Sequence, residues 1–191
     1  TKSVPKGATL KLLMWNIQYG ASRNYHFFYD GGTDVGVQKK HVTETMDALA
    51  TVIRTHDPDI VMLQEVDRGS RRTHHIDQHI ELLNRLDYPD HVSTSYHNVT
   101  FVPHPTWEPI GKVDMHLSVL SKYRIDSATR YQLPLLNESA IRRFFNLRRA
   151  LLEIRLPTST GDDLLIFNTH LSAFSQRDGT LERQIAVLND H

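Results

Sequence analysis

The sequence predicts a mixed α+β domain in which strands form sheets and helices cover them. Short apolar, β-prone runs recur along the chain and are separated by turn residues, whereas only a few segments repeat apolar residues at helical spacing. The run at 60–64 is apolar almost throughout, as in a strand covered on both faces. Because the chain has no internal repeat, low-complexity segment or linker, we expect residues 1–191 to form a single domain.

The first half of the chain alternates strands with helices. A strand is expected over 10–19, followed by a loop rich in aromatic residues and glycine. Residues 38–56 predict an amphipathic helix because apolar side chains recur every three or four positions, and Pro58 ends it. A second helix is expected around Ile76, Ile80 and Leu83.

The second half is predominantly strands. They are expected over 91–102, 117–120, 125–133, 147–156 and 164–169, with a proline-rich loop after the first. Apolar residues at helical spacing from Leu181 indicate a last helix, with Asp178 or Thr180 as its N-cap.

Composition narrows the class of protein. Hydrophobic residues make up 39% and charged residues 23%, values typical of a soluble globular domain. No apolar run approaches the roughly 18 residues of a membrane span, and no signal peptide is recognisable, although the first residue, Thr1, leaves room for a removed one. The absence of cysteine excludes disulfides and thiolate zinc sites, and the compartment stays undetermined.

Three strongly apolar runs end in a polar residue of chemical interest: Asn16, Glu65 and His170. A carboxylate at the end of a buried strand requires a metal ion or an arginine as its partner, and both alternatives stay open on these residues alone. An asparagine at a strand end often forms a turn or caps a helix. With 12 histidines in the chain, most are expected to be incidental.

The segments around these residues resemble the endonuclease/exonuclease/phosphatase family of Mg²⁺-dependent phosphoesterases. The first motif is LLMWNI at 12–17, the second DPDIVMLQEVDRG at 57–69, and the third LLIFNTHL at 164–171. All three occur in the family's order and with similar spacing. The resemblance implies a DNase-like α/β/β/α sandwich and hydrolysis of phosphoester bonds.

The resemblance also implies roles for individual residues. Glu65 would bind Mg²⁺, with Mn²⁺ as a substitute, and Asn16 would help to position the metal and the scissile phosphate. His170 would contact the phosphate, and Asp114 is the candidate carboxylate that orients its imidazole. Gln18 is either a further site residue or a glutamine facing solvent.

Two further motifs of the family, G-D-x-N and S-D-H, do not occur in this sequence. Because the chain ends inside an expected helix at His191, we expect the C-terminal part of the catalytic domain, with its general base, to lie outside it. The alternatives are a noncatalytic binding module or an inactive fragment of the same fold, and a plain structural domain.

The substrate class stays open between nucleic acid, phospholipid and a small phosphoester. The formal net charge is zero, which favours a small or lipid-linked phosphoester over long nucleic acid. Specificity is expected from the loops at 20–37 and 103–113. The aromatic residues of the first loop would stack on a base, insert into a lipid surface or pack the loop down.

Other conspicuous patterns have ordinary interpretations. The histidine-rich segment 74–79 is expected to be a solvated face, and the arginine-rich segment 142–149 a surface stretch. Asn98 and Asn137 lie in glycosylation acceptor patterns, which carry no meaning without the compartment.

Overall fold

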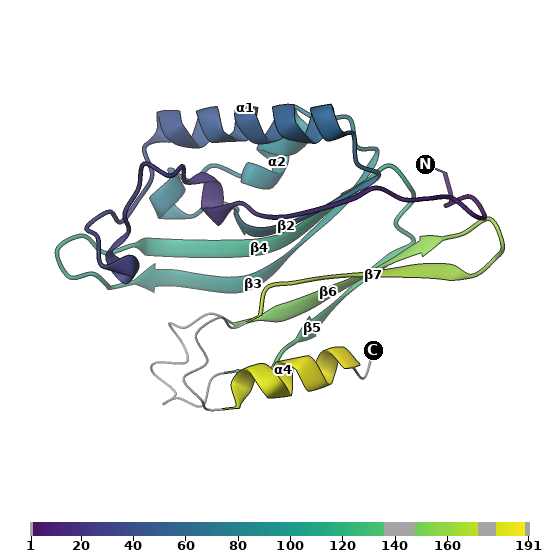
Figure 1. Ribbon diagram of the computed structural model, residues 1–191. Helices are drawn as coiled ribbons and strands as arrows, with labels where there is room; N and C mark the ends of the chain where they lie inside the picture. Colours follow the sequence, from purple (N-terminus) through teal and green to yellow (C-terminus); the bar gives the residue numbers. More distant parts are fainter. Residues whose placement is uncertain (1, 136–147, 172–178, 190–191) are drawn as a thin grey trace.

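A computed structural model describes residues 2–135, 148–171 and 179–189. Two β-sheets pack face to face, with α1 (Lys39–His56) and α2 (Gln78–Leu83) covering one sheet and α4 (Thr180–Asn189) lying against the other (Figure 1). The layered α+β sandwich predicted from the sequence is confirmed.

The first sheet has four strands in the order β1 (Leu12–Asn16), β2 (Ile60–Asp67), β4 (Gly111–Ser121) and β3 (Asp90–Val102). Strand β1 pairs in parallel with β2, and the remaining pairs are antiparallel. Strand β2 lies between the core under α1 and the core between the sheets, so almost all of its residues are buried. The prediction of a strand covered on both faces is therefore confirmed.

The second sheet has three antiparallel strands in the order β5 (Ser127–Gln132), β6 (Ala150–Pro157) and β7 (Asp163–Thr169). Its inner face contributes Leu152, Ile154 and Leu156 to the core between the sheets. Three short 3₁₀ turns, Gln18–Gly20, Phe28–Asp30 and Arg71–Thr73, complete the described elements.

The helices follow the sequence pattern closely. Helix α1 buries Met46 and Ile53 in the core that it shares with β2, and Val42 in a separate cluster with Tyr19 and Phe27, as their spacing predicts. Helix α2 is short and begins at Asp77, whose side chain accepts a hydrogen bond from the backbone N–H of Ile80. Among the described residues, no helix combines the length and apolarity that a membrane crossing requires.

Two of the differences from the predicted strand boundaries concern the candidate site residues. Strand β1 ends at Asn16, because Gln18 and Tyr19 adopt left-handed backbone conformations with φ of 44° and 42°. Strand β4 begins at Gly111, six residues earlier than predicted, because Val113 and Met115 extend its inward-facing alternation. Asp114 therefore lies within a strand.

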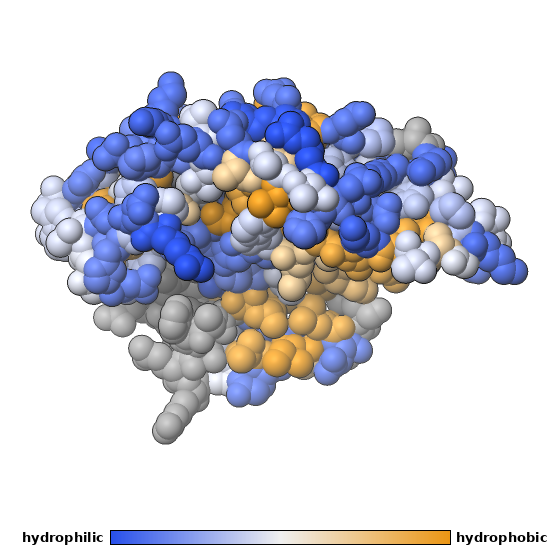
Figure 2. Space-filling model, turned by 45° about the horizontal axis from the view of Figure 1, so that its top comes forward, coloured by the Kyte–Doolittle hydropathy of each residue, from blue (hydrophilic) through white to orange (hydrophobic). Residues whose placement is uncertain are grey.

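The edge strand β1 carries exposed apolar side chains. Leu12 and Met14 are 49% and 71% exposed, and both are in register with core residues of β2, Ile60 and Met62. The space-filling view shows apolar surface across the middle of one face of the molecule (Figure 2). The core between the sheets is thus open at the β1 edge.

The histidine-rich segment is only partly the solvated face that we expected. His74 and His75 are exposed, but His79 is 3% exposed and its Nε2 lies 3.2 Å from Nδ1 of His91. The prediction was wrong for His79 because α2 turns this position toward β3. Asn137, Asp178 and residues 142–147 lie outside the described residues.

Candidate functional site

Glu65 lies at an irregularity in β2 that changes the direction of its side chain. Leu63 pairs with Ser118 and Val66 with His116, so two residues of β2 oppose one residue of β4. Glu65 itself has φ of 56°, an uncommon conformation for a residue other than glycine. Such bulges and strained positions concentrate at functional sites. This local geometry distinguishes Glu65 from an ordinary strand residue.

Asn16 holds the Glu65 carboxylate from the neighbouring strand. Its Nδ2 donates to Oε1 of Glu65 at 3.0 Å, and its Oδ1 accepts the backbone N–H of Gln18 at 2.9 Å. The backbone donor fixes the orientation of the amide, which presents nitrogen to the carboxylate. In this geometry Asn16 orients Glu65, and Gln18 orients Asn16 through its backbone.

His170, directly after β7, faces the same carboxylate. Its Nε2 lies 3.6 Å from Oε1 of Glu65, while its Nδ1 lies 2.8 Å from Nη1 of Arg149 and 3.4 Å from the Tyr96 hydroxyl. Burial, together with the charge of Arg149, lowers the pKa of His170 to about 4. The structure therefore brings Asn16, Glu65 and a neutral His170 together from three strands.

A buried pair of amides joins the two sheets beside this site. Gln64 Nε2 donates to Oδ1 of Asn168 at 2.7 Å, and Asn168 Nδ2 donates to the carbonyls of Leu63 and Ser118, at 3.1 Å each. Asn168 is 1% exposed. Because Gln64 precedes Glu65 and Asn168 lies two positions before His170, these hydrogen bonds fix the distance between the strand ends that carry the site.

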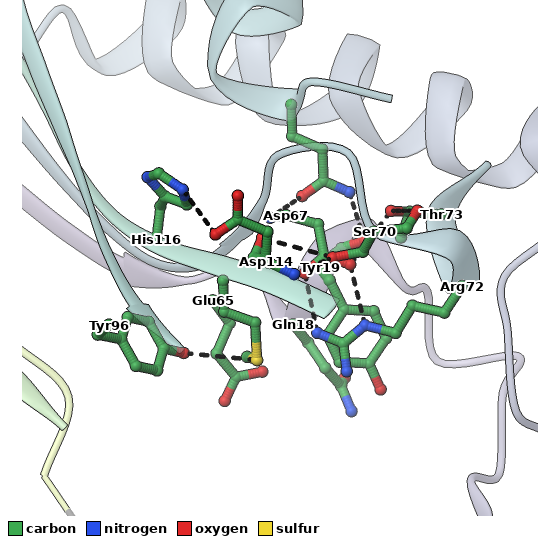
Figure 3. Close-up of polar contacts among 12 residues, drawn as sticks. Gln18, Tyr19, Glu65, Asp67, Ser70, Arg72, Thr73, Tyr96, Asp114 and His116 are labelled. Atoms are coloured by element: carbon green, nitrogen blue, oxygen red, sulfur yellow. Dashed lines mark hydrogen bonds and ion pairs between the residues drawn. The ribbon is translucent and has the colours of Figure 1, made fainter. Parts of the chain in front are cut away.

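A buried ion pair supports the site from the side of α2 (Figure 3). Asp67 is fully buried and accepts two hydrogen bonds from Arg72, at 2.9 Å each, and one from Thr73 Oγ1 at 3.1 Å. The Arg72 guanidinium lies 3.7 Å from the centre of the Tyr19 ring. Burial alone would lower the pKa of Arg72, but the charge of Asp67 raises it overall.

This ion pair connects the chain segments that follow the two predicted ligands. Asp67 is two residues beyond Glu65, and Tyr19 is three beyond Asn16. Gln78 links the same segments, since it accepts the backbone N–H of Asp67 at 3.0 Å and donates to the carbonyl of Tyr19 at 2.6 Å.

Asp114 is not the partner of His170, contrary to the prediction. Its carboxylate contacts Nε2 of His116 at 3.0 Å (Figure 3). It also accepts a hydrogen bond from the Ser95 hydroxyl at 2.9 Å. Burial alone raises the pKa of Asp114, but these contacts lower it below its ordinary value. The prediction failed because Asp114 alternates with Met115, so it faces the outer side of the sheet, away from the core side where His170 lies.

Sequence reasoning missed two residues of the site, Arg149 and Tyr96. The arginine-rich segment was expected at the surface, but Arg149 is only 7% exposed, and Tyr96 is 1% exposed. A single arginine before a strand carries no sequence signal that separates a buried residue from an exposed one. Both residues become recognisable only through their contacts with His170.

The residues present suit a metal ion held mainly by water and substrate. Among the described residues there is no group of three or more histidine, cysteine, aspartate or glutamate side chains that could hold a metal. Mg²⁺ commonly uses one or two carboxylates and keeps several waters. Glu65 is partly accessible, with 17% of its side chain exposed, and could supply one such carboxylate.

A separate cavity of about 590 Å³ lies between the loop at 33–39, the segment 71–75 and the loop at 108–110. Neither Asn16, Glu65 nor His170 lines it. The cavity is therefore distinct from the site built on the strand ends.

The sequence comparison agrees with this fold. Residues 14–183 match the profile of the Endonuclease/Exonuclease/phosphatase family. The chain belongs to this family, and the resemblance noted in its three motifs is confirmed. No curated protein sequence gives a significant match to the chain.

Solved structures of the same fold include three informative relatives. The chain is 25% identical to an endonuclease/exonuclease/phosphatase from Beutenbergia cavernae, with a TM-score of 0.63 over 95% of this chain and 44% of that one. It is 14% identical to mannosyl-6-phosphatase Bt3783 from Bacteroides thetaiotaomicron (TM-score 0.59; 95% and 58% covered). It is 15% identical to TDP2 from Caenorhabditis elegans (TM-score 0.55; 95% and 40% covered). The chain thus spans about half the length of these relatives.

Proposed function

We propose that the protein hydrolyses phosphoester bonds with the help of a Mg²⁺ ion bound at Glu65. The main support is the convergence of Asn16, Glu65 and His170 from three strands on one point, with Glu65 in a strained conformation at a strand bulge. Membership of the family supports the same reaction class.

The metal ion and the residues of the site would have separate roles in the reaction. The bound Mg²⁺ would supply positive charge that polarises a phosphoryl oxygen and stabilises the departing oxyanion. Asn16 keeps the Glu65 carboxylate in one orientation. His170 would donate a hydrogen bond to a phosphoryl oxygen and so orient the phosphate for in-line attack by water. No described residue is assigned as the general base.

The substrate proposal is a small or lipid-linked phosphoester. A formal net charge of zero gives the chain no general attraction for the backbone of long nucleic acid. The preference is tested by comparing p-nitrophenyl phosphate, bis-p-nitrophenyl phosphate, p-nitrophenyl phosphorylcholine and a DNA oligonucleotide as substrates. Mn²⁺ is expected to replace Mg²⁺ in these assays.

The decisive variant is Glu65→Ala. We expect Mg²⁺-dependent hydrolysis to fall by at least about 100-fold, because the carboxylate that holds the metal is lost, while the circular dichroism spectrum stays unchanged. Glu44→Ala is the matched control, since Glu44 is an exposed residue of α1 that pairs with Lys40 one turn away; this variant should retain full activity.

Two results would contradict the proposal. Unchanged hydrolysis by the Glu65→Ala variant would remove Glu65 from the metal site. Absence of Mg²⁺-dependent turnover of all four substrates by the wild-type protein would favour the alternative, a noncatalytic binding module.

A further inference from the structure

Arg149 is a buried cation that points into the site. It lies immediately before β6, with only 7% of its surface exposed. Its backbone is fixed, because its carbonyl accepts the backbone N–H of Leu133 at 3.1 Å and Nε2 of Gln132 at 2.8 Å. Its guanidinium lies 5.9 Å from the centre of the Tyr96 ring. The side chain is thus held in a defined direction toward His170.

The contact between Arg149 and His170 has only one consistent arrangement of hydrogen atoms. A guanidinium carries five N–H donors and no acceptor. The 2.8 Å distance between Nη1 of Arg149 and Nδ1 of His170 is that of a hydrogen bond, so the imidazole must provide the lone pair. The Tyr96 hydroxyl, 3.4 Å from the same nitrogen, is a second potential donor. Nδ1 of His170 therefore carries no proton.

We infer that Arg149 is a positioning residue that fixes His170 in the tautomer whose proton is on Nε2, so that His170 acts as a hydrogen-bond donor and not as a base. Nε2 is the nitrogen that faces Glu65, at 3.6 Å from Oε1. The N–H is directed to the place where a phosphate beside Glu65 would lie. The role toward a phosphate rests on the proposed function, whereas the tautomer itself does not.

The inferred tautomer of His170 is the opposite of the one that a carboxylate partner at Nδ1 would favour. A carboxylate beside Nδ1 accepts a hydrogen bond from a proton on that nitrogen and leaves Nε2 with the lone pair of a base. Asp114, the one carboxylate predicted for this role, is engaged by His116 and Ser95. An arginine at Nδ1 reverses the polarity of the ring and makes Nε2 the donor.

The tautomer can be read directly by ¹⁵N-detected NMR of the apo protein with ¹⁵N-labelled histidine at neutral pH. Long-range ¹H–¹⁵N couplings distinguish a ring protonated on Nε2 from one protonated on Nδ1. The signals of His170 are assigned by their loss in a His170→Gln variant. We expect His170 to show only the tautomer protonated on Nε2, and a proton on Nδ1 would overturn the inference.

Two variants test whether Arg149 is responsible. Arg149→Met removes the donor at similar length, and the form protonated on Nδ1 should become detectable. Arg149→Lys keeps a donor, and the wild-type tautomer should persist. If Arg149→Met leaves His170 entirely protonated on Nε2, Arg149 does not fix the tautomer. Should Arg149→Met fail to fold, Arg149→Gln serves instead, since its amide can either donate or accept and should give a mixture.

Activity supplies a separate readout. The amide nitrogen of glutamine can imitate an Nε2–H donor, whereas the shorter asparagine places its amide nearer to Nδ1. We therefore expect His170→Gln to retain at least about ten times the kcat of His170→Asn. Equal loss in both variants would contradict the donor role. Because the NMR experiment needs no substrate, failure of the proposed hydrolase reaction would leave the tautomer result intact.

Discussion

The buried ion pair between Asp67 and Arg72 makes the sharpest prediction about stability. Asp67→Asn preserves the size of the side chain but removes its charge. Arg72, whose side chain is 8% exposed, would then be a cation without its carboxylate. Removing one member of a buried ion pair costs about 3–5 kcal/mol, because the other charge remains desolvated.

The contacts of the pair indicate a loss near the middle of that range. Asparagine keeps a single acceptor oxygen, so at least one of the two hydrogen bonds from Arg72 is lost, and the bonds that remain, including the one from Thr73, no longer end on a charged carboxylate. The contact between Arg72 and the Tyr19 ring survives and retains about 1 kcal/mol. A loss near 4 kcal/mol is a large share of the 5–15 kcal/mol that stabilises a typical domain.

The assay is urea unfolding followed by circular dichroism. With a slope of about 2 kcal/mol per molar urea, a loss of about 4 kcal/mol lowers the midpoint by about 2 M. Asp126→Asn is the matched control, because Asp126 pairs with Arg124 at 3.1 Å where both side chains are about half exposed. We expect that variant to change stability by no more than about 0.5 kcal/mol.

A double-mutant cycle separates the pair from the loss of each group. The variant that combines Asp67→Asn with Arg72→Gln removes both charges and should be more stable than the sum of the single losses predicts. If Asp67→Asn costs no more than Asp126→Asn, the buried pair does not stabilise the fold, and the reasoning from its burial fails.

Three smaller predictions concern other parts of the molecule. Asn168→Ala should cost about 2–4 kcal/mol in urea unfolding, because it leaves the buried amide of Gln64 and the carbonyl of Leu63, both in the first sheet, without their partner from the second; a cost below about 1 kcal/mol would show that the sheets dock without it. Gly20→Ala should lower the free energy of unfolding more than Gly161→Ala does, although φ is positive at both positions (72° and 92°). Of these two glycines, only Gly20 has side-chain atoms 3.0 Å from an added Cβ. Equal urea midpoints for the two variants would refute this reasoning. Burial, with the charge of Arg68, lowers the pKa of His79 to about 4, so its neutral form is favoured in the folded state. Stability should therefore fall by up to about 3 kcal/mol as the pH drops from about 6.5 to about 4, and unfolding of His79→Gln should lose that part of the pH dependence.

The parts of the fold that sequence predicted well depend on local periodicity. Helix α1 and strand β2 were both placed correctly, because spacing and continuous apolar character are properties of neighbouring residues. The family resemblance implied that Asn16, Glu65 and His170 act at one metal and phosphate site, and the three side chains do lie together.

The errors involve contacts that depend on strand register. Whether Asp114 faces the core or the outer side changes with a single-residue shift of β4. The partner of His170 was expected to be this carboxylate, but the register of β6 beside β7 places Arg149 there. The direction of Glu65 depends on a bulge, which exists only in the pairing with β4. No single segment of sequence contains this information.

The hydrogen bond between Gln64 and Asn168 also has a kinetic consequence, because it joins residues 104 positions apart in the chain. Forming a contact of such long separation requires the closure of a long loop, and contacts of this kind slow folding. Neither sheet can assemble the site alone, since Glu65 comes from one and His170 follows a strand of the other. A folding intermediate with native helices and strands but undocked sheets would therefore be inactive, and during unfolding function should disappear before secondary structure does.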